Sequence, residues 1–328
     1  MTQAEPLVEI WRGPLCESAH AGHVVVCDAG GAIVEAWGDP DQVIFPRSSC
    51  KMLQALPLIH SGAAAARGLG PAHLALACAS HEGAALHRVA VEAWLGDLGL
   101  GEPDLRCGVQ APSDVAERDA LIRAKVGACQ VHNNCSGKHA GFLTLSQHLG
   151  GDAEYLDIAH PVQRMARNAF EEATGADSAF WATDGCSAPN FSTTVHGLAR
   201  AMGRFAGATD TTTEGRAMVA LREAMMTHPD LVAGEGRACT ELMRAAPGVA
   251  VKTGAEGVYV AIIPERRLGI ALKITDGTTR AAEAVITRLL IRLGLLDAAH
   301  PAAQKRLGPI RNWRGIQTGH IAASAALG

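Results

Sequence analysis

The stretch GVAVKTGAEGVYVAIIPERRLGIALKITDG, residues 248–277, decides the fold class of this chain. Apolar and β-branched residues alternate with small or polar ones on both sides of Pro264–Arg267. Two such runs separated by a short polar turn predict antiparallel strands joined as a hairpin. The C-terminal part of the chain is therefore expected to contribute to an antiparallel sheet.

Strand patterns also occur near the other end of the chain. LVEIWRG at 7–13 and HVVVCDAGGAIVEAWG at 23–38 are β-rich runs, with a hairpin-like junction at Gly30–Gly31. The tail IRNWRGIQTGHIAA at 310–323 is suited to one last strand. Strands at both ends of the chain are expected to meet in one sheet.

Helical spacing fills most of the remaining sequence. A helix is expected from about Ser48 to Ile59, a strongly amphipathic one at 278–294, and several more between about 64 and 245. We therefore expect an α+β fold, an α/β sandwich, with an antiparallel sheet from both chain ends and a large helical middle region at about 64–245. No linker forces a boundary, so a single domain over 1–328 is expected.

The composition narrows the class of function. Hydrophobic residues make up 48% and charged residues 19%, and the net charge is -4, which argues against nucleic-acid binding. No run approaches the roughly 18 apolar residues that span a bilayer, and no export signal opens the chain. We expect a cytoplasmic protein with no membrane partner. The nine scattered cysteines argue against a disulfide framework.

Lysine is rare in this chain, so its positions carry information. There are six lysines among 29 basic residues. Ser48 and Lys51 stand three residues apart at a helix start, where the amine can take the hydroxyl proton and activate a nucleophile. Unlike arginine, a desolvated lysine can lose its proton near neutral pH. The alternative is that Ser48 or Ser49 caps the helix.

Two further segments fit a serine acyl-transfer site. Lys252-Thr253-Gly254 has the form of the Lys-Thr-Gly strand that accompanies Ser-x-x-Lys, although a chance tripeptide is the alternative. The third motif of penicillin-recognising enzymes is missing, because Ser113-Asp114 is followed by valine. In ACASHEGA at 77–84, Ser80 follows a buried run and suits a cavity edge, or else a helix cap with Glu82 in the first turn.

A metal site is also indicated. Cys135, Lys138 and His139 lie in HNNCSGKHAGF, and TDGCSAPNF adds Asp184 and Cys186. Ordinary zinc chemistry would combine the two cysteines with His132 or His139 and a fourth ligand or water, whereas buried free cysteines are the alternative.

Taken together, PRSSCK, ASHEG, NNCSGKHAGF, DGCSAPNF and VKTGAEG resemble the motif series of the rhizobial-type (class 3) L-asparaginases, over roughly residues 5–320. The resemblance implies a serine β-lactamase/glutaminase-like fold, a homodimer, hydrolysis of L-asparagine to L-aspartate and ammonia, and a zinc ion near the active site. Thr253 departs from the family, which often has a smaller residue there.

Carried over by position, the resemblance also implies roles for single residues. Ser48 would be the nucleophile paired with Lys51, and a second pair would join Ser80 to Lys252. The implied zinc ligands are Cys135, Lys138 and Cys186, and the implied outer partners are His139 and Asp184.

Substrate recognition and the rival functions follow from chemistry. A free amino acid needs a cation for its carboxylate and an acid for its ammonium, for which Arg47 and Glu82 are candidates. One methylene is worth only about 1–3 kcal/mol in a pocket, so a glutaminase, or an esterase or peptidase of the same fold, is an alternative. A zinc-binding sensor without catalysis is the alternative from another class. Whether zinc is catalytic, positioning or structural stays open.

Overall fold

The computed structural model describes residues 3–328, and the chain divides into two compact units. Unit 1 consists of residues 3–49, 193–207 and 241–328, and unit 2 of residues 50–192 and 208–240. Each unit is assembled from separate parts of the sequence, so the chain passes between them several times.

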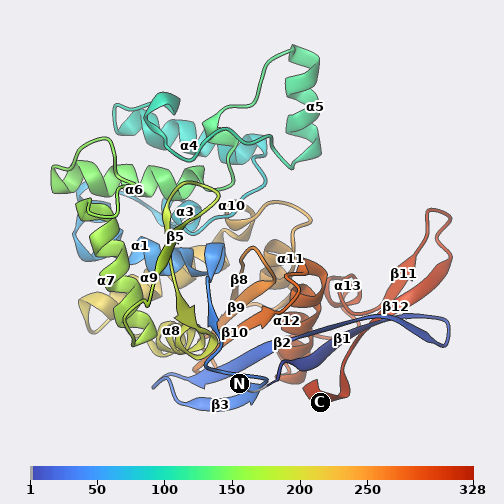
Figure 1. Cartoon of the computed structure of the whole chain (residues 1–328). Coiled ribbons are helices and arrows are strands. Elements are labelled where there is room, and N and C mark those ends of the chain that lie inside the picture. The colour runs from blue at the N-terminus through green and yellow to red at the C-terminus, as the bar shows by residue number, and fades with distance from the viewer. Residues whose placement is uncertain (1–2) are drawn as a thin grey trace. The chain divides into compact units, whose positions relative to one another are not determined.

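Unit 1 contains an eight-stranded antiparallel sheet (Figure 1). Its order is β11-β12-β1-β2-β10-β9-β8, and β3 also pairs with β2. Strands from both chain ends therefore lie side by side, which confirms the predicted sheet. The bounds are β1 (Glu5–Arg12), β2 (Leu15–Asp28), β3 (Ile33–Trp37), β8 (Ala250–Thr253), β9 (Val258–Ile263), β10 (Leu268–Ile274), β11 (Pro309–Arg311) and β12 (Gln317–Ala323). A separate two-stranded pair joins β4 (Val43–Ile44) to β7 (Thr193–Thr194).

The predicted hairpins form where turn residues interrupt the apolar alternation. β9 and β10 pair from Ile263 and Leu268, and the turn closes with a hydrogen bond from Arg267 N to Pro264 O of 3.0 Å. β2 and β3 pair across Gly30–Gly31, as predicted.

The tail at 310–323 differs from the prediction, because it forms two strands rather than one. Between β11 and β12 the Asn312 side chain accepts hydrogen bonds from Arg314 N and Ile316 N, both 3.0 Å long, and Gly315 has a φ of +76°. A side-chain oxygen that binds nearby backbone N–H groups stabilises a tight turn. The tail therefore folds back on itself, and β12 pairs with β1.

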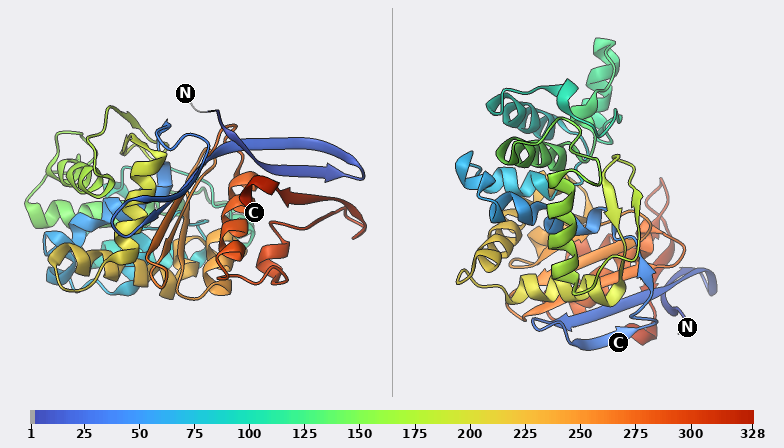
Figure 2. Two further views of the ribbon diagram at one scale, coloured as in Figure 1. Left: turned by 90° about the horizontal axis from the view of Figure 1, so that it is seen from below. Right: turned by 60° about the vertical axis from the view of Figure 1, so that its left-hand side comes forward.

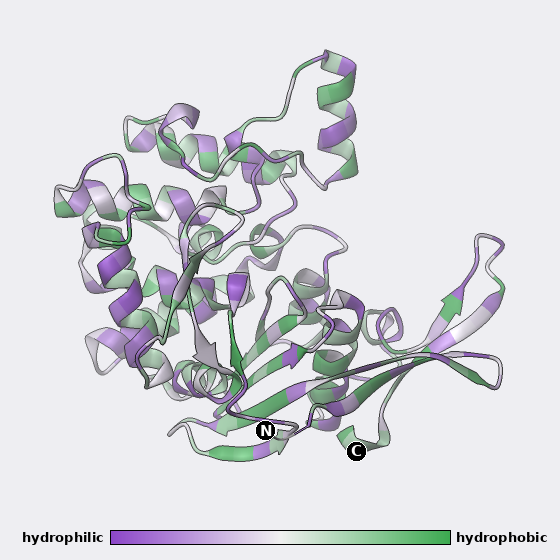
Figure 3. Ribbon diagram, viewed as in Figure 1, coloured by the Kyte–Doolittle hydropathy of each residue, from purple (hydrophilic) through white to green (hydrophobic). Residues whose placement is uncertain are grey.

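Both faces of the sheet are covered at its centre. The central strands are mainly hydrophobic (Figure 3), and all six residues of β9 are buried, which requires packing on each side. α8 (Val195–Gly207) packs on β10, β2 and β9, and α12 (Thr279–Arg292) packs on β9, β10, β1 and β12 (Figure 2). A Cβ at Gly269 would lie 2.0 Å from Gly203 N, so only glycine permits the close approach of β10 to α8.

Unit 2 is mainly helical. Its helices pack on one another, α1 on α6, α7 and α9, and α3 on α6 and α9. The bounds are α1 (Lys51–His60), α2 (Ala63–Ala66), α3 (Pro71–Ala77), α4 (Ala85–Asp97), α5 (Val115–Ala124), α6 (Ser136–Leu149), α7 (Pro161–Thr174), α9 (Thr213–Thr227) and α10 (Pro229–Val232), with η2 (Glu102–Asp104), η3 (Gln130–His132) and the strand pair β5 (Trp181–Thr183) and β6 (Pro189–Phe191).

The helical part differs in extent from the predicted region at about 64–245. It begins already with α1, whereas α8 belongs to unit 1 because its apolar face packs on the sheet. Two elements contain a unit boundary, η1 (Arg47–Cys50) and α11 (Ala238–Ala245), while α13 (Pro301–Gln304) and η4 (Ala325–Leu327) complete unit 1. No helix within residues 3–328 combines the length and apolar character needed to cross a bilayer.

Candidate active site

The turn that carries Ser48 has an unusual backbone. Arg47, which begins η1, has a φ of +54°, a left-handed conformation that is uncommon for a residue with a side chain. Ser49 is fully buried and its hydroxyl donates to Pro46 O at 2.7 Å. The N-cap of α1 is Cys50, which makes no side-chain capping bond. Neither serine therefore caps α1, and Ser49 braces the turn on which Ser48 stands.

The Lys-Thr-Gly segment lies against this same turn. A Cβ at Gly254 would lie 2.6 Å from Pro46 O and 3.1 Å from Ser49 N, so a larger residue would displace the turn. Lys252 and Thr253 end β8, and Lys252 has no exposed surface. Within unit 1 the structure thus brings the 252–254 segment to the turn of Ser48.

Lys51 is enclosed within unit 2. It is only 1% exposed, and its Nζ donates to Ala79 O, to Ser80 Oγ at 3.0 Å and to Cys135 Sγ at 3.0 Å. An ammonium has three protons to donate, so these three acceptors can satisfy it completely. The sequence assigned Lys51 to Ser48, and the structure shows it in contact with Ser80.

Each of the two predicted serine–lysine pairs combines one residue of unit 1 with one residue of unit 2. Ser48 and Lys252 belong to unit 1, and Lys51 and Ser80 belong to unit 2. The pairings of Ser48 with Lys51 and of Ser80 with Lys252 therefore stay predictions.

Ser80 is held by the backbone of an irregular segment between α3 and α4. Ser80 N donates to Val232 O at 2.9 Å, and Glu82 N donates to Ala233 O at 3.0 Å. The N-cap of α4 is Ala84, so the alternative of a helix cap at Ser80 is wrong. The segment 80–84 is instead pinned to the chain that follows α10.

His81 fixes this segment from the inside. Its Nδ1 accepts from Gly83 N at 3.1 Å, so its Nε2 carries the proton that faces Ser136 Oγ at 3.0 Å. The ring stacks on His87 with centroids 4.6 Å apart. Burial, and then the positive charges that His87 and Lys51 can carry, hold the pKa of His81 well below its ordinary value. The imidazole is therefore neutral.

Glu82, a candidate for substrate binding, already has a structural partner. The side chain is buried and its Oε1 accepts from Glu235 N at 2.9 Å. A Cβ at Gly234 would lie 2.1 Å from the same oxygen. Burial, followed by the charge of Asp114, raises the pKa of Glu82.

The two predicted cysteines meet a lysine in the interior of unit 2. Lys138 Nζ donates to Cys186 Sγ at 3.1 Å, and all three side chains are buried. Cys186 reaches this position from the turn between β5 and β6, where Ser187 N donates to Asp184 O at 2.8 Å. Ser187 has a φ of +68°, which lets the turn close in four residues.

The charges in this cluster are coupled. The hydrogen-bond contact between Cys186 and Cys135, together with the charge of Lys138, holds the pKa of Cys186 well below its ordinary value, against the effect of burial. The same bond, together with burial, raises the pKa of Cys135. Burial lowers the pKa of Lys138, but the sulfurs of Cys186 and Cys135 outweigh it and raise that pKa overall. Lys138 and Cys186 therefore each favour the charged form of the other.

The donor atoms fit a zinc ion only if the lysine is a ligand. No group of three or more His, Cys, Asp and Glu residues suited to a metal ion occurs within residues 3–328. Two sulfurs and one amine form an acceptable set, because tetrahedral Zn–S and Zn–N bonds of about 2.3 and 2.0 Å separate S and N by about 3.5 Å. The Lys138–Cys186 separation is close to that value.

The residues around this cluster include two that the sequence reasoning missed. Tyr155 is fully buried, and its hydroxyl lies 2.9 Å from His139 Nδ1. Asn134 Oδ1 accepts from Cys135 Sγ at 2.9 Å. Asp184 is half-buried and its charge contributes to the raised pKa of Lys138. Tyr155 is one of two tyrosines in the chain, and that rarity was its only signal.

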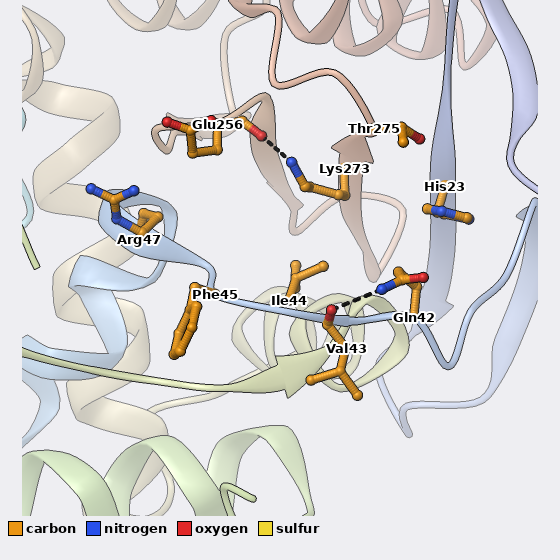
Figure 4. A pocket seen from close by; sticks show the side chains of 9 residues that line it. All are labelled: His23, Gln42, Val43, Ile44, Phe45, Arg47, Glu256, Lys273 and Thr275. Carbon is orange, nitrogen blue, oxygen red and sulfur yellow. Dashed lines mark hydrogen bonds between the residues drawn. The ribbon is translucent and has the colours of Figure 1, made fainter. Parts of the chain in front are cut away.

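Unit 1 also contains a pocket of about 410 Å³ (Figure 4). It is lined by His23, Gln42, Val43, Ile44, Phe45, Arg47, Glu256, Lys273 and Thr275. Arg47, the other candidate for substrate binding, therefore lies at a cavity within its own unit.

Comparison with known sequences decides the family. Residues 8–323 match the family described as L-asparaginase II. The chain belongs to the L-asparaginase II family. As a member it is an amidohydrolase, and the resemblance found from the five motifs is confirmed. Among curated proteins none matches the chain.

Solved structures similar to this L-asparaginase II chain have low sequence identity. Bacillus glutaminase has a TM-score of 0.46 and 13% identity, covering 84% of this chain and 91% of that one. A β-lactamase from Mycobacterium bovis has a TM-score of 0.37 and 13% identity, covering 83% and 94%. The native form of Mglu has a TM-score of 0.45 and 15% identity, covering 88% and 68%. The family assignment rests on the sequence match over residues 8–323.

Proposed function

We propose that this protein is an L-asparaginase that hydrolyses L-asparagine to L-aspartate and ammonia by means of a serine activated by lysine. The family match supports amide hydrolysis. The observation that carries the proposal is the buried contact of 3.0 Å between Lys51 Nζ and Ser80 Oγ. The buried Lys51 amine lies within hydrogen-bond reach of a hydroxyl, which is the geometry that proton transfer requires.

In the proposed reaction Ser48 is the nucleophile and neutral Lys51 takes its proton. The Ser48 oxygen attacks the side-chain carboxamide carbon, and a tetrahedral intermediate forms. The C–N bond then breaks, an aspartyl ester remains on Ser48, and ammonia leaves with a proton that passes through Ser80 and Lys252. Water hydrolyses the ester and restores the serine. The Lys51–Ser80 hydrogen bond supports this route, because it offers the captured proton a path to Ser80.

Ser48 is proposed as the nucleophile rather than its neighbour. The hydroxyl of Ser49 is committed to Pro46 O, so Ser49 has a structural role. The left-handed backbone of Arg47 next to Ser48 supports this choice, since strained residues concentrate at functional sites.

We further propose that Cys135, Lys138 and Cys186 hold a zinc ion, with His139 and Asp184 around them. The buried contact of Lys138 with Cys186 and the low pKa of that thiol support this set. When bound, zinc would supply a fixed positive charge close to the site, and Lys138 would have to be neutral to donate its lone pair.

The resemblance also supports a homodimer in the cytoplasm as part of this proposal. Sedimentation velocity of the purified chain tests the first point, since a dimer of a 34.1 kDa chain is easily told from a monomer. Fractionation of the cells that produce the protein tests the second.

Ammonia release from L-asparagine and L-glutamine, together with hydrolysis of a chromogenic ester, tests the function. We expect L-asparagine to give the highest kcat/KM, with a covalent ester on Ser48 visible by mass spectrometry after rapid acid quenching. A higher kcat/KM for glutamine or for the ester would replace asparaginase by the corresponding alternative. Zinc binding without turnover of any of the three would favour the sensor.

A further inference from the structure

The pocket in unit 1 brings together opposite charges from distant parts of the sequence. Arg47 comes from the turn after β4, Glu256 from the loop between β8 and β9, and Lys273 from β10 (Figure 4). The pocket volume of about 410 Å³ lies in the range of small-molecule sites. A pocket with two cations and one carboxylate suits a ligand that carries both an anionic and a cationic group.

His23 adds one further donor to the lining of the pocket, which already includes Lys273. Lys273 is half-buried, and its amine donates to the carbonyls of Glu256 and Ile274, which fixes its position. His23 Nδ1 accepts from Asp39 N at 2.8 Å, so the neutral ring carries its proton on Nε2. Burial lowers the pKa of His23, which keeps the ring neutral. The Lys273 amine and the His23 ring are therefore held in place by backbone groups.

Arg47 and Glu256, two of the three charged residues of the pocket, have an unusual backbone conformation. Five residues other than glycine have a positive φ, among those that the structure describes: Arg47, Lys125, Ser187, Glu256 and Arg267. Lys125 is a helix C-cap, and Ser187 and Arg267 close hairpin turns. Glu256 precedes Gly257, also at positive φ, in a position where asparagine or aspartate is favoured. A longer acid at such a position indicates a role for its side chain.

The pocket adjoins the turn of the proposed nucleophile within unit 1. Arg47 immediately precedes Ser48. Glu256 follows Gly254 by two residues, and Gly254 lies against Pro46 and Ser49. A small molecule held between Arg47 and Glu256 would thus lie beside the turn that carries Ser48.

We propose that this pocket binds the α-carboxylate and α-ammonium groups of the amino-acid substrate, with Arg47 and Lys273 facing the carboxylate and Glu256 facing the ammonium. This inference rests on the proposed function for its kinetic part only. It assigns the acid to Glu256 and not to Glu82, because Glu82 Oε1 already accepts a hydrogen bond from Glu235 N.

The test compares ligands that differ by one amine. Succinamate is asparagine without its α-amine, and succinate is aspartate without it. A charge-assisted hydrogen bond corresponds to about 10- to 100-fold in affinity. We expect the protein to prefer L-asparagine over succinamate in kcat/KM, and L-aspartate over succinate in calorimetric binding, by about that factor. Glu256→Gln should remove most of both preferences.

Three variants make the result specific. Glu265→Gln changes an exposed glutamate in the turn between β9 and β10 and should keep both preferences. Glu256→Asn, whose residue type tolerates the left-handed backbone, should behave like Glu256→Gln and guards against a folding defect. Glu82→Gln should keep the preference for the amine.

The outcomes separate this inference from the proposed function. Turnover of L-asparagine with an undiminished amine preference in Glu256→Gln would overturn the inference and leave the function intact. Loss of the preference in Glu82→Gln alone would also overturn it. Binding of L-aspartate that depends on Glu256 in a protein that releases no ammonia would support the pocket and contradict the asparaginase proposal.

Discussion

Lys51 Nζ lies 3.0 Å from Ser80 Oγ, within a site where the lysine is almost fully buried. The two residues are 29 positions apart along the chain and meet because α1 and the segment after α3 belong to the same helical unit. The Lys51 amine contacts a hydroxyl, a carbonyl and a sulfur atom in the interior of that unit.

Replacing this amine should abolish turnover while the chain stays folded. Lys51→Met keeps a side chain of similar length but removes the base, and general-base catalysis is worth about 10²–10⁴-fold. We expect kcat for L-asparagine to fall by at least 100-fold. Lys125→Met, at an exposed helix C-cap, is the matched control and should keep normal turnover. Normal kcat in Lys51→Met would contradict the proposed mechanism.

The two neighbouring serines should separate catalysis from stability. Ser48→Ala should remove turnover and the covalent ester with little change in melting temperature. Ser49→Ala loses a buried hydrogen bond to Pro46 O, which costs about 1 kcal/mol of unfolding free energy, but should keep a measurable kcat. Thermal melts and ammonia release on both variants check this. An active Ser48→Ala together with a dead Ser49→Ala would reverse the assignment.

Gly254 should be intolerant of any side chain. A Cβ there meets backbone atoms of Pro46 and Ser49, so Gly254→Ala must move the turn of Ser48. Overpacking costs about 1–3 kcal/mol, and a shift of the turn should lower kcat/KM by at least 10-fold. Gly127→Ala, where a Cβ has no neighbour within 4 Å, is the control. Unchanged kinetics and stability in Gly254→Ala would refute the close packing.

The zinc proposal can be tested without any activity measurement. We expect about one zinc ion per chain in protein prepared with zinc, and cobalt substitution should give a thiolate charge-transfer band. Cys186→Ser and Lys138→Met should both lose the metal. Cys239→Ser, at a buried cysteine elsewhere in unit 2, should retain it. Full zinc content in Lys138→Met would exclude the lysine as a ligand.

Stability should fall as the pH drops below about 6.5, the ordinary pKa of histidine. The pKa of His81 is depressed in the folded chain, so the unfolded chain binds the proton first and protonation favours unfolding. Each such histidine contributes a slope of up to about 1.4 kcal/mol per pH unit. His81→Gln should reduce the slope of unfolding free energy between pH 5 and 6.5 in denaturant titrations. An unchanged slope would contradict a neutral buried His81.

The sequence was sufficient for the elements that local patterns control. The hairpin at Pro264–Arg267, the junction at Gly30–Gly31 and the helix at 278–294 follow from alternation, turn residues and helical spacing. The predicted limits of the helical middle region, about 64–245, differ from the structure where an element is placed by contacts with residues distant in the sequence. α8 was read as part of the helical middle, but its apolar face packs on the sheet.

Sequence alone also selected the residues with unusual chemistry, because lysine and the Ser-x-x-Lys and Lys-Thr-Gly patterns are distinctive whatever the fold. Only the tertiary structure decided which of them meet. Lys51 turned out to contact Ser80, Lys138 to contact Cys186, and Arg47 to share a pocket with Glu256 and Lys273. Spacing along a helix or strand fixes near neighbours, whereas contacts between distant segments depend on how whole elements pack, which no local pattern records.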